Sequence, residues 1–256
     1  MKHIQVISDL HLEARTDNIN IPVKSEILFL AGDIGNIQQN NYENFICECS
    51  KKWKIIISVL GNNEYYSDQY SMEELLIKYK KLYSKYDNCY LLERNIVMLG
   101  SIKIIGCTSW GTFKKKHIGS SPRKIKRRNE TGILKPIGIE FLTKKHLDDV
   151  KWIMKNIDNY SPTVIITHFP LMLENNKVRQ EKHRNEDRSI LEEFGRECEL
   201  HSNNKLVCIS GHTHYSHNFN RAGVRYISNQ IGKQDEIGTT NFNENCDFNI
   251  FDICSI

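Results

Sequence analysis

Residues 55–64 read IIISVLGNNE: a run of β-forming residues ends at a glycine, and two asparagines and a glutamate follow. A short run this rich in isoleucine and valine is typical of a strand buried in a sheet. The polar residues after it fit an ordinary turn, but they also fit a set of oxygen donors directed at a ligand. Because the same pattern recurs along the chain, the other copies help to decide between the two interpretations.

Four further apolar runs, at residues 4–8, 27–31, 163–166 and 206–210, also lead directly into polar residues. Each polar residue taken alone has an ordinary explanation, such as a turn or a solvent-facing histidine. Five strand ends of this kind in one chain are hard to obtain by accident. The carboxylates, carboxamide and imidazoles that follow the runs are Asp9, His11, Asp33, Asn62, His168, His212 and His214.

Helical patterns alternate with these predicted strands. Residues 71–74 read SMEE, a capping box at which we expect a helix to start. A second helix is predicted from about Thr143 to a point before Pro162, and the charged segment 185–200 is a candidate third helix. The residues expected on the apolar faces of the first two helices are Leu75, Tyr79, Leu82 and Tyr86, then Leu147, Val150, Met154 and Ile157.

Two more strands are predicted near the end of the chain, at residues 224–228 and 248–253. Strands that alternate with helices favour an α/β fold. In such folds ligands gather at the carboxyl ends of the strands, which is where the polar residues of this chain fall.

Composition sets broader bounds. The chain has 256 residues, a net charge of +4 and 39% hydrophobic residues, which suits one large α/β domain or two small ones. Its eight cysteines show no framework spacing, so we expect reduced, mostly buried thiols. We find no signal segment and no apolar run long enough to span a bilayer, and therefore expect a soluble, cytoplasmic protein without a membrane partner.

The segment at about 112–135 interrupts the alternation of strands and helices. It is rich in lysine and arginine, especially between residues 114 and 128, and has few apolar residues. We expect a basic, cap-like surface loop. It would either steer phosphate-bearing substrates or simply be solvated, and the sequence favours neither.

The seven strand-end residues form a plausible metal-binding set. A mixture of nitrogen and oxygen donors without thiolate suits Mn²⁺, and also Fe, Zn²⁺ or Co²⁺, better than Ca²⁺ or Mg²⁺. Four imidazoles, two carboxylates and a carboxamide exceed the needs of one ion. They suit two ions about 4 Å apart, an arrangement that clamps the attacking and leaving oxygens of a phosphoryl group.

In these strand-end residues the sequence resembles the calcineurin-like metallophosphoesterase superfamily. The signature of that superfamily is D-x-H, G-D, G-N-H-D/E, a strand-end histidine and G-H-x-H, in this order. The present chain reads DLH at 9–11, GD at 32–33, GNNE at 61–64, His168, and GHTH at 211–214. The match extends over nearly the whole chain.

The resemblance implies a single domain over residues 1–256, folded as a four-layer αββα sandwich of two mixed sheets flanked by helices. It also implies a dinuclear centre of divalent metal ions. The ligands carried over by position are Asp9, His11 and His214 for one ion, Asn62, His168 and His212 for the other, and Asp33 as the bridge.

The activity implied by the resemblance is hydrolysis of phosphate esters by direct attack of a hydroxide that bridges the two metals. One position departs from the family pattern, because Asn63 stands where a histidine normally stabilises or protonates the leaving oxygen. A carboxamide donates a hydrogen bond but transfers no proton at neutral pH. Asn63 is therefore the candidate catalytic residue. His117 and His217 are candidate replacements for the missing histidine, although the ordinary expectation for each is a solvent-facing side chain.

Several functional alternatives remain open from the sequence. A phosphoprotein phosphatase is disfavoured, because aliphatic residues occupy the positions of the phosphate-holding arginines at 37 and 60. A phosphodiester or a nucleotide-type small molecule is the favoured substrate. The alternatives are a binding or scaffold module with impaired catalysis, suggested by Asn63, and a nuclease, suggested by the basic segment although no nucleic-acid module is recognisable.

Overall fold

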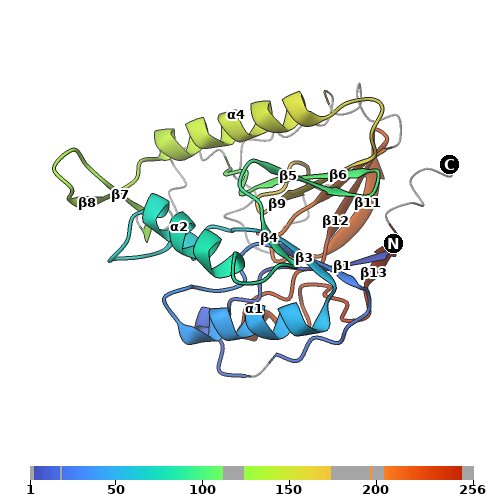
Figure 1. Cartoon of the computed structure of the whole chain (residues 1–256), viewed down its shortest axis with the longest axis horizontal. Helices are drawn as coiled ribbons and strands as arrows, with labels where there is room; N and C mark the ends of the chain where they lie inside the picture. Colours follow the sequence, from blue (N-terminus) through green and yellow to red (C-terminus); the bar gives the residue numbers. More distant parts are fainter. Residues whose placement is uncertain (1–2, 18, 112–123, 174–196, 198–204, 250–256) are drawn as a thin grey trace.

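The computed structural model describes residues 3–17, 19–111, 124–173, 197 and 205–249. In this part of the chain, two mixed β-sheets lie face to face and helices cover their outer sides (Figure 1). The α/β fold with two mixed sheets expected from the sequence is confirmed. The predicted helix at 185–200 lies outside the described residues, apart from Glu197.

The two sheets contain five and six strands. In spatial order, the five-stranded sheet consists of β13 (Asp247–Asn249), β1 (His3–Ile7), β2 (Ile27–Ala31), β3 (Ile55–Val59) and β4 (Cys89–Leu91). The six-stranded sheet consists of β11 (His217–Arg221), β12 (Val224–Ser228), β10 (Leu206–Ile209), β9 (Thr163–Thr167), β6 (Ile102–Cys107) and β5 (Asn95–Leu99). Strands β1–β4 run parallel in the first sheet, with β4 at one edge, and β6, β9, β10 and β12 run parallel in the second. The other edge strands, β13, β11 and β5, pair antiparallel.

Alternating side chains along the strands explain why each sheet is covered on both sides. In β2, Phe29 packs between the two sheets, whereas Leu28 and Leu30 pack outward against the helices. In β9, Val164 and Ile166 likewise face the other sheet, and the intervening residue faces outward. Because successive side chains in a strand point to opposite faces, an apolar strand needs an apolar partner on each side.

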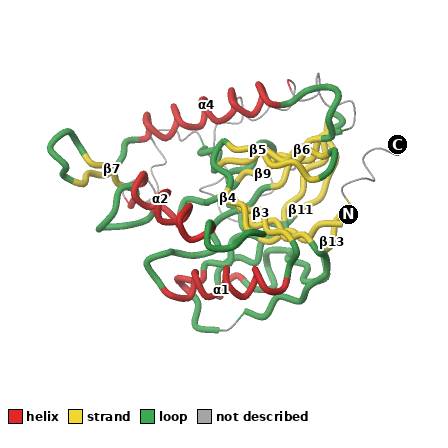
Figure 2. The backbone as a smooth tube through the Cα atoms, in the orientation of Figure 1, coloured by secondary structure: helices red, strands yellow, loops and turns green. Residues whose placement is uncertain are grey.

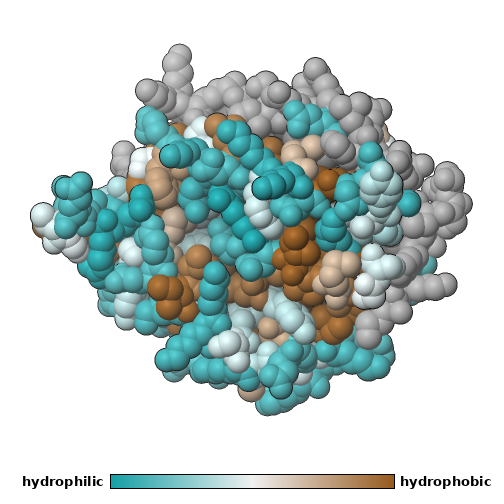
Figure 3. All heavy atoms as spheres, turned by 45° about the horizontal axis from the view of Figure 1, so that its top comes forward, coloured by the Kyte–Doolittle hydropathy of each residue, from teal (hydrophilic) through white to brown (hydrophobic). Residues whose placement is uncertain are grey.

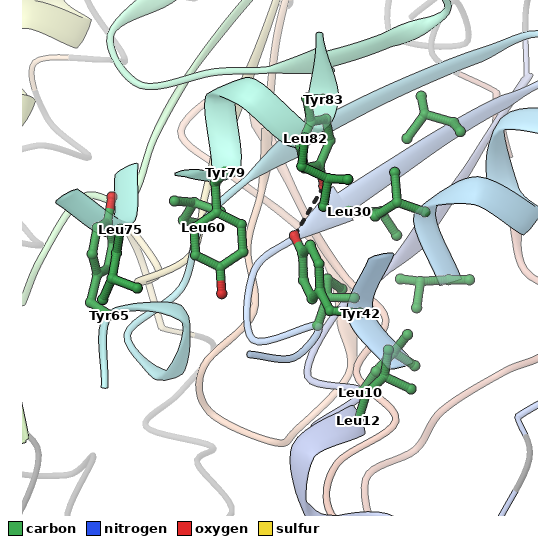
Figure 4. Packing of buried hydrophobic residues seen from close by; sticks show 14 of the residues in the cluster. Leu10, Leu12, Leu30, Tyr42, Leu60, Tyr65, Leu75, Tyr79, Leu82 and Tyr83 are labelled. Carbon is green, nitrogen blue, oxygen red and sulfur yellow. Dashed lines mark hydrogen bonds between the residues drawn. The ribbon is translucent and has the colours of Figure 1, made fainter. Parts of the chain in front are cut away.

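Among the described residues, three α-helices supply the outer layers: α1 (Asn40–Lys52), α2 (Met72–Tyr83) and α4 (Ile139–Asn156). Figure 2 shows α4 on the side of the six-stranded sheet and α1 on the side of the five-stranded sheet. Helices α1 and α2 meet through aromatic residues, and the Tyr42 and Tyr83 hydroxyls lie 3.2 Å apart in a hydrogen bond (Figure 4). Helix α1 was not predicted from the sequence, because its buried face carries few apolar residues.

The predicted helix starts have different outcomes. The capping box at the start of α2 is confirmed, with Ser71 and Glu74 exchanging hydrogen bonds. Helix α4 begins at Ile139, four residues earlier than the predicted Thr143. Leu147 is 40% exposed, so its predicted place on the buried face is wrong, and Asp149 is fully buried there instead.

The described end of the basic segment is not a loop. Strands β7 (Lys126–Arg128) and β8 (Leu134–Pro136) form an antiparallel hairpin that projects beside α2 (Figure 1). Lys126 pairs with Asp68, Arg127 with Glu73 and Arg128 with Glu74. These basic side chains therefore pair with acidic residues at and just before the start of α2. The expectation of a cap-like loop over 112–135 is wrong for the part of this segment that forms the hairpin.

The face drawn in Figure 3 is mostly hydrophilic, with its apolar residues in separate areas. Within the described residues, no helix has the length and apolar character needed to cross a membrane. Four of the six described cysteines, Cys49, Cys89, Cys107 and Cys208, are buried.

Candidate metal centre

The residues predicted as metal ligands converge from both sheets. Asp9 and His11 follow β1, Asp33 follows β2 and Asn62 follows β3. From the other sheet, His168 follows β9, and a loop directly after β10 carries the remaining two histidines, His212 and His214. All seven side chains are buried. The carboxyl ends of the parallel strands thus place polar groups in the interior, where a ligand or a charge partner has to compensate them.

Asp9, His11 and His214 form the first compact group, and the potential ligand atoms of the three residues lie within 4.8 Å of one another. The Nε2 atoms of His11 and His214 are 3.0 Å apart. Asp9 Oδ1 lies 3.4 Å from His214 Nε2. Two imidazole nitrogens and a carboxylate oxygen therefore point at one location.

Asp9, Asp33 and His168 form a second compact group beside the first. Asp33 faces both groups: its Oδ1 is 3.4 Å from His168 Nε2, and its Oδ2 is 3.9 Å from His11 Nε2. The side-chain oxygen of Asn62 is 3.1 Å from His168 Nε2. Asn62 and Asp33 thus both lie close to His168 Nε2.

For His212, the structure gives ring contacts and a backbone hydrogen bond. Its ring lies 5.1 Å from the His168 ring between centroids and 3.9 Å from the ring of Phe169. Its backbone N–H donates to the Asp9 carboxylate, at 3.1 and 3.0 Å from the two oxygens. Within the described residues, His212 belongs to neither compact group.

The backbone at the centre is unusual. Asp9, His11, Asp33, His212 and His214 all have positive φ, between 50° and 74°. This left-handed region costs a non-glycine residue free energy, on the order of 1–3 kcal/mol each, and such residues cluster at functional sites. The fold therefore accepts local strain in order to direct these side chains inward.

Glycines precede three of the predicted ligands because the loops touch one another. A Cβ on Gly61 would lie 2.2 Å from Asp33 Oδ1, and a Cβ on Gly211 would lie 2.5 Å from Asp9 Oδ2. Any side chain at either position would push a carboxylate out of the centre. Gly61 has no positive φ, so close approach to Asp33, and not a sharp turn, explains it.

The electrostatics of the centre favour positive charge. Burial works to raise the pKa of Asp9, but its hydrogen bond with His214 and the nearby imidazoles lower that pKa overall. Burial works to lower the pKa of His214, yet Asp9 and Glu236 raise it to about 9. The donor set fits divalent cations, because buried carboxylates and imidazole nitrogens at these distances require a cation or protons between them.

Asn63, the predicted catalytic residue, contacts Asp33. Its backbone N–H donates to Asp33 Oδ1 at 2.8 Å, and its side-chain Nδ2 donates to Asp33 Oδ2. Glu64 is fully buried and accepts hydrogen bonds from the backbone N–H groups of Asp33, Ile34, Gly35 and Gly61. The GNNE segment therefore holds the loop that carries Asp33.

Several residues that support the centre had no signal in the sequence. Glu13 contacts His11, Glu236 contacts His214, and Gln230 accepts the backbone N–H of His214 at 2.6 Å. Glu13 and Glu236 lie in short 3-10 helices and Gln230 follows β12, and none of the three belongs to the strand-tip pattern.

A cavity of about 640 Å³ lies next to the centre and is lined by Asn36, Tyr66 and Lys124, among others. The Tyr66 hydroxyl accepts a hydrogen bond from the Asn62 side chain at 2.8 Å, which links the cavity to the predicted ligands. The Lys124 ammonium lies 5.1 Å from the centre of the Tyr66 ring. The cavity is therefore polar, and its wall carries one basic and one acidic side chain, Lys124 and Asp68.

The two histidines considered as replacements for the missing one differ in outcome. His117 lies outside the described residues. His217 is only 9% exposed, so the expectation of a solvent-facing side chain is wrong. Burial lowers its pKa to about 4, which leaves the imidazole neutral at neutral pH. His217 is therefore poorly suited to protonate a leaving group.

Buried carboxylates and imidazoles that converge at the carboxyl ends of parallel strands from two sheets are typical of metal-dependent hydrolases. Residues 2–216 match the calcineurin-like phosphoesterase family, Metallophos. The chain belongs to this family of metal-dependent hydrolases.

Two further proteins are similar to nearly the whole chain. Uncharacterized protein L509 of Acanthamoeba polyphaga mimivirus is 28% identical over 281 residues, and the match covers 95% of each chain. The crystal structure of phosphopantetheinyl hydrolase (PptH) from Mycobacterium tuberculosis superimposes with a TM-score of 0.60, covering 91% of this chain and 90% of that one. At 15% identity, this second similarity shows the shared fold.

Proposed function

We propose that the protein is a dinuclear metal-dependent phosphoesterase that acts on a phosphodiester or a nucleotide-type substrate. The observation that carries the proposal is the position of Asp33, whose two oxygens face His11 on one side and His168 on the other. Asp9, His11 and His214 would hold one cation, Asn62, His168 and His212 the other, and Asp33 would bridge them. Mn²⁺ is the ion we expect first, with Fe, Zn²⁺ or Co²⁺ as alternatives.

When bound, divalent cations supply Lewis-acid chemistry that activates water and neutralises charge on phosphoryl oxygens. The chain's own residues contribute orientation. Asn63 donates hydrogen bonds to both carboxylate oxygens of Asp33. Glu64 accepts four backbone N–H groups, three from residues 33–35 and one from Gly61, and so holds the two loops together. Such preorganised groups lower the barrier because they need not rearrange during the reaction.

The surroundings of the centre support a small ester over a phosphoprotein. Leu60, at a position where phosphoprotein phosphatases carry a phosphate-holding arginine, is 1% exposed and packs in the core. The neighbouring cavity of about 640 Å³ has the size of a small-molecule site. Lys124 at its wall would contact an anionic group of such a substrate, whereas Asp68 at the same wall would repel it.

The test is hydrolysis of bis-(p-nitrophenyl) phosphate with added Mn²⁺, compared between the wild type and Asp33→Ala. We expect activity that depends on the metal and falls to background in Asp33→Ala, while the control Asp148→Ala, changed at a site on α4, keeps the wild-type rate. Thermal melts establish that both variants fold, and His168→Ala provides a second probe if Asp33→Ala does not fold. An Asp33→Ala enzyme as active as the wild type would rule out the two-metal proposal.

A panel of substrates then separates the classes. It includes p-nitrophenyl monoester, cyclic nucleotides, nucleoside polyphosphates, a phosphopantetheinyl ester and single-stranded nucleic acid. We expect the highest kcat/KM on a diester or nucleotide. A preference for nucleic acid would instead favour the nuclease, and metal binding without hydrolysis of any substrate would favour the scaffold module.

A further inference from the structure

The cavity next to the centre is formed by the same loops that carry two of the predicted ligands. One of these loops runs on from Asp33 after β2, and the other runs on from Asn62 after β3. The Asn62 side chain donates to the Tyr66 hydroxyl at 2.8 Å, so the cavity wall begins one side chain away from a predicted ligand. A group attached to a phosphate ester at the centre would therefore have this cavity within reach.

Hydrogen bonds between the two loops fix the shape of the cavity. Asn36 and Ser67 are 9% and 8% exposed. The Asn36 carboxamide donates to the backbone carbonyl oxygen of Tyr66 at 2.9 Å, and the Ser67 hydroxyl donates to Gln38 Oε1 at 2.8 Å. Gln38 Nε2 in turn donates to Asn36 Oδ1 at 2.9 Å. Because these groups satisfy one another, the cavity exists before a ligand arrives, as is usual for small-molecule sites.

The charges at the cavity wall oppose one another. Lys124 is the basic side chain of the lining and Asp68 the acidic one. The other lining side chains are a tyrosine, a serine and four carboxamides, which carry no charge at neutral pH. A second phosphate group would meet both attraction and repulsion here, whereas a neutral polar group would meet neither. The cavity therefore suits a neutral group.

The rim of the cavity offers carboxamides and an aromatic ring. Gln39 and Gln69 line it from the two loops, and both residues are exposed. A carboxamide has an acceptor oxygen beside donor N–H groups, so it can bond to the edge of a nucleobase at two points. The Tyr66 ring lies at the same wall, and an aromatic ring gives a base a face to stack on. The ammonium of the exposed Lys124 lies over this ring, 5.1 Å from its centre, where a base would take its place.

We propose that this cavity recognises the nucleobase of a nucleoside phosphate ester. Tyr66 stacks on the base, and Gln39 and Gln69 bond to its edge, so these three residues determine specificity. The inference rests on the proposed function, since the base belongs to the ester that the centre would hydrolyse, and it adds which side chains discriminate between substrates.

The test uses p-nitrophenyl diesters that share one leaving group and differ in the group on the other side of the phosphate. One set carries the common 2′-deoxynucleosides, linked through the 5′ oxygen. A matched ester carries the same sugar without a base, and another carries a butyl chain that ends in a second phosphate. With Mn²⁺ added, we expect kcat/KM to be about tenfold or more higher on the preferred deoxynucleoside ester than on the abasic ester. The ester with the second phosphate should have no such advantage.

Variants at the wall test the named residues through the ratio of kcat/KM on the base-bearing ester to that on the abasic ester. Gln39→Leu combined with Gln69→Leu removes both carboxamides and should lower this ratio to below about threefold. Tyr66→Leu should also lower the ratio, whereas Tyr66→Phe keeps the ring and should preserve it. The matched control is Asn159→Leu, which removes an exposed carboxamide from the loop after α4, outside the cavity lining, and should leave the ratio unchanged.

Equal kcat/KM on the base-bearing and abasic esters in the wild type would overturn the inference. An unchanged ratio in the variant without both glutamines, or a higher kcat/KM on the ester with the second phosphate, would also overturn it. Hydrolysis of these esters without any preference for a base would leave the proposed function intact.

Failure to hydrolyse any ester would instead count against the proposed function, and saturation-transfer NMR with the free deoxynucleosides then tests the cavity independently. We expect transfer to the base protons in the wild type and its loss in the variant without both glutamines. Absence of transfer in the wild type, or undiminished transfer in that variant, would contradict recognition of the base.

Discussion

At the scale of single residues, the pair Asp33 and Asn63 defines the chemistry of the centre. Asn63 occupies the place of a family histidine, yet its carboxamide donates to Asp33 Oδ2. In the described structure Asn63 therefore contacts the carboxylate that lies between the two proposed metal positions. A carboxamide transfers no proton, so help for the leaving group has to come from elsewhere or be absent.

Replacing Asn63 with histidine tests this interpretation. We expect Asn63→His to raise kcat mainly on substrates with poor leaving groups, by tenfold or more, because general-acid help is worth about 10²–10⁴-fold. The measurement is a series of aryl phosphodiesters with leaving groups of different pKa. Asn63→Ala is the control and should lower the rate on all of them about equally. An equal gain for good and poor leaving groups in Asn63→His would contradict the assignment.

The packing of Gly61 against Asp33 gives a second prediction at this scale. A Cβ in Gly61→Ala would overlap Asp33 Oδ1, so we expect about 1–3 kcal/mol lower free energy of unfolding and at least about tenfold weaker Mn²⁺ binding. Urea denaturation and Mn²⁺ titration measure the two effects. The control Gly138→Ala, where the Cβ would meet only the end of the Glu140 side chain, should cost no more than about 1 kcal/mol and leave Mn²⁺ binding unchanged. If Gly61→Ala bound Mn²⁺ with wild-type affinity, the position of Asp33 would not matter for metal binding, and the prediction would be wrong.

At the scale of elements, α4 packs on the six-stranded sheet with a buried carboxyl group on its inner face. Asp149 is fully buried, and its Oδ1 accepts from Arg94 Nε at 2.7 Å. Burial and the nearby Glu93 raise the pKa of Asp149 to about 6, although Arg94 counteracts them. The sequence predicted an apolar face for this helix and gave no sign of this carboxyl group.

This pKa has a consequence for stability. In the unfolded chain Asp149 ionises near pH 4, whereas in the folded protein it keeps its proton until about pH 6. The folded state thus binds more protons between these values, and its stability falls as the pH rises through this window. Asp149→Asn removes the titration and keeps an acceptor for Arg94.

We therefore expect Asp149→Asn to gain stability relative to the wild type, by about 1–3 kcal/mol, as the pH rises from 4 to 7. Urea denaturation at several pH values measures the difference. Asp148→Asn, at the less buried neighbouring position, should track the wild type throughout. A constant difference between Asp149→Asn and the wild type at all pH values would contradict the raised pKa.

At the scale of the whole molecule, the predicted metal ligands come from both sheets. Asp9, Asp33 and Asn62 follow strands of the five-stranded sheet, and His168 and His214 follow strands of the six-stranded sheet. Bound cations would therefore join the two layers at the carboxyl ends of their strands. Because the unfolded chain lacks this arrangement, the free energy of metal binding adds to the stability of the fold.

Removal of metal by a chelator should lower the melting temperature. At a free Mn²⁺ concentration of 100 times the dissociation constant, binding stabilises the folded state by about 2.7 kcal/mol. For a chain of this size that corresponds to about 5–10 °C, which calorimetry can measure. Asp33→Ala should show a much smaller difference between the chelated and Mn²⁺-loaded samples. Equal melting temperatures of the wild type with and without Mn²⁺ would contradict a structural contribution of the metal.

The sequence by itself determined the strand-tip pattern, and with it the α/β class, the family and the candidate ligands. These features are local, because an apolar run and the polar residue after it are adjacent in the chain. The tertiary structure decided what the sequence could not: that Asn63 holds Asp33, that Gly61 has no room for a side chain, and that Glu13 and Glu236 lie behind two of the histidines. Except for the Glu13 pair, these contacts join residues that are 22 or more positions apart, and all depend on how loops pack at the ends of two sheets. Spacing in a sequence does not encode such packing, whereas the close approach of buried charges makes it decisive for the centre.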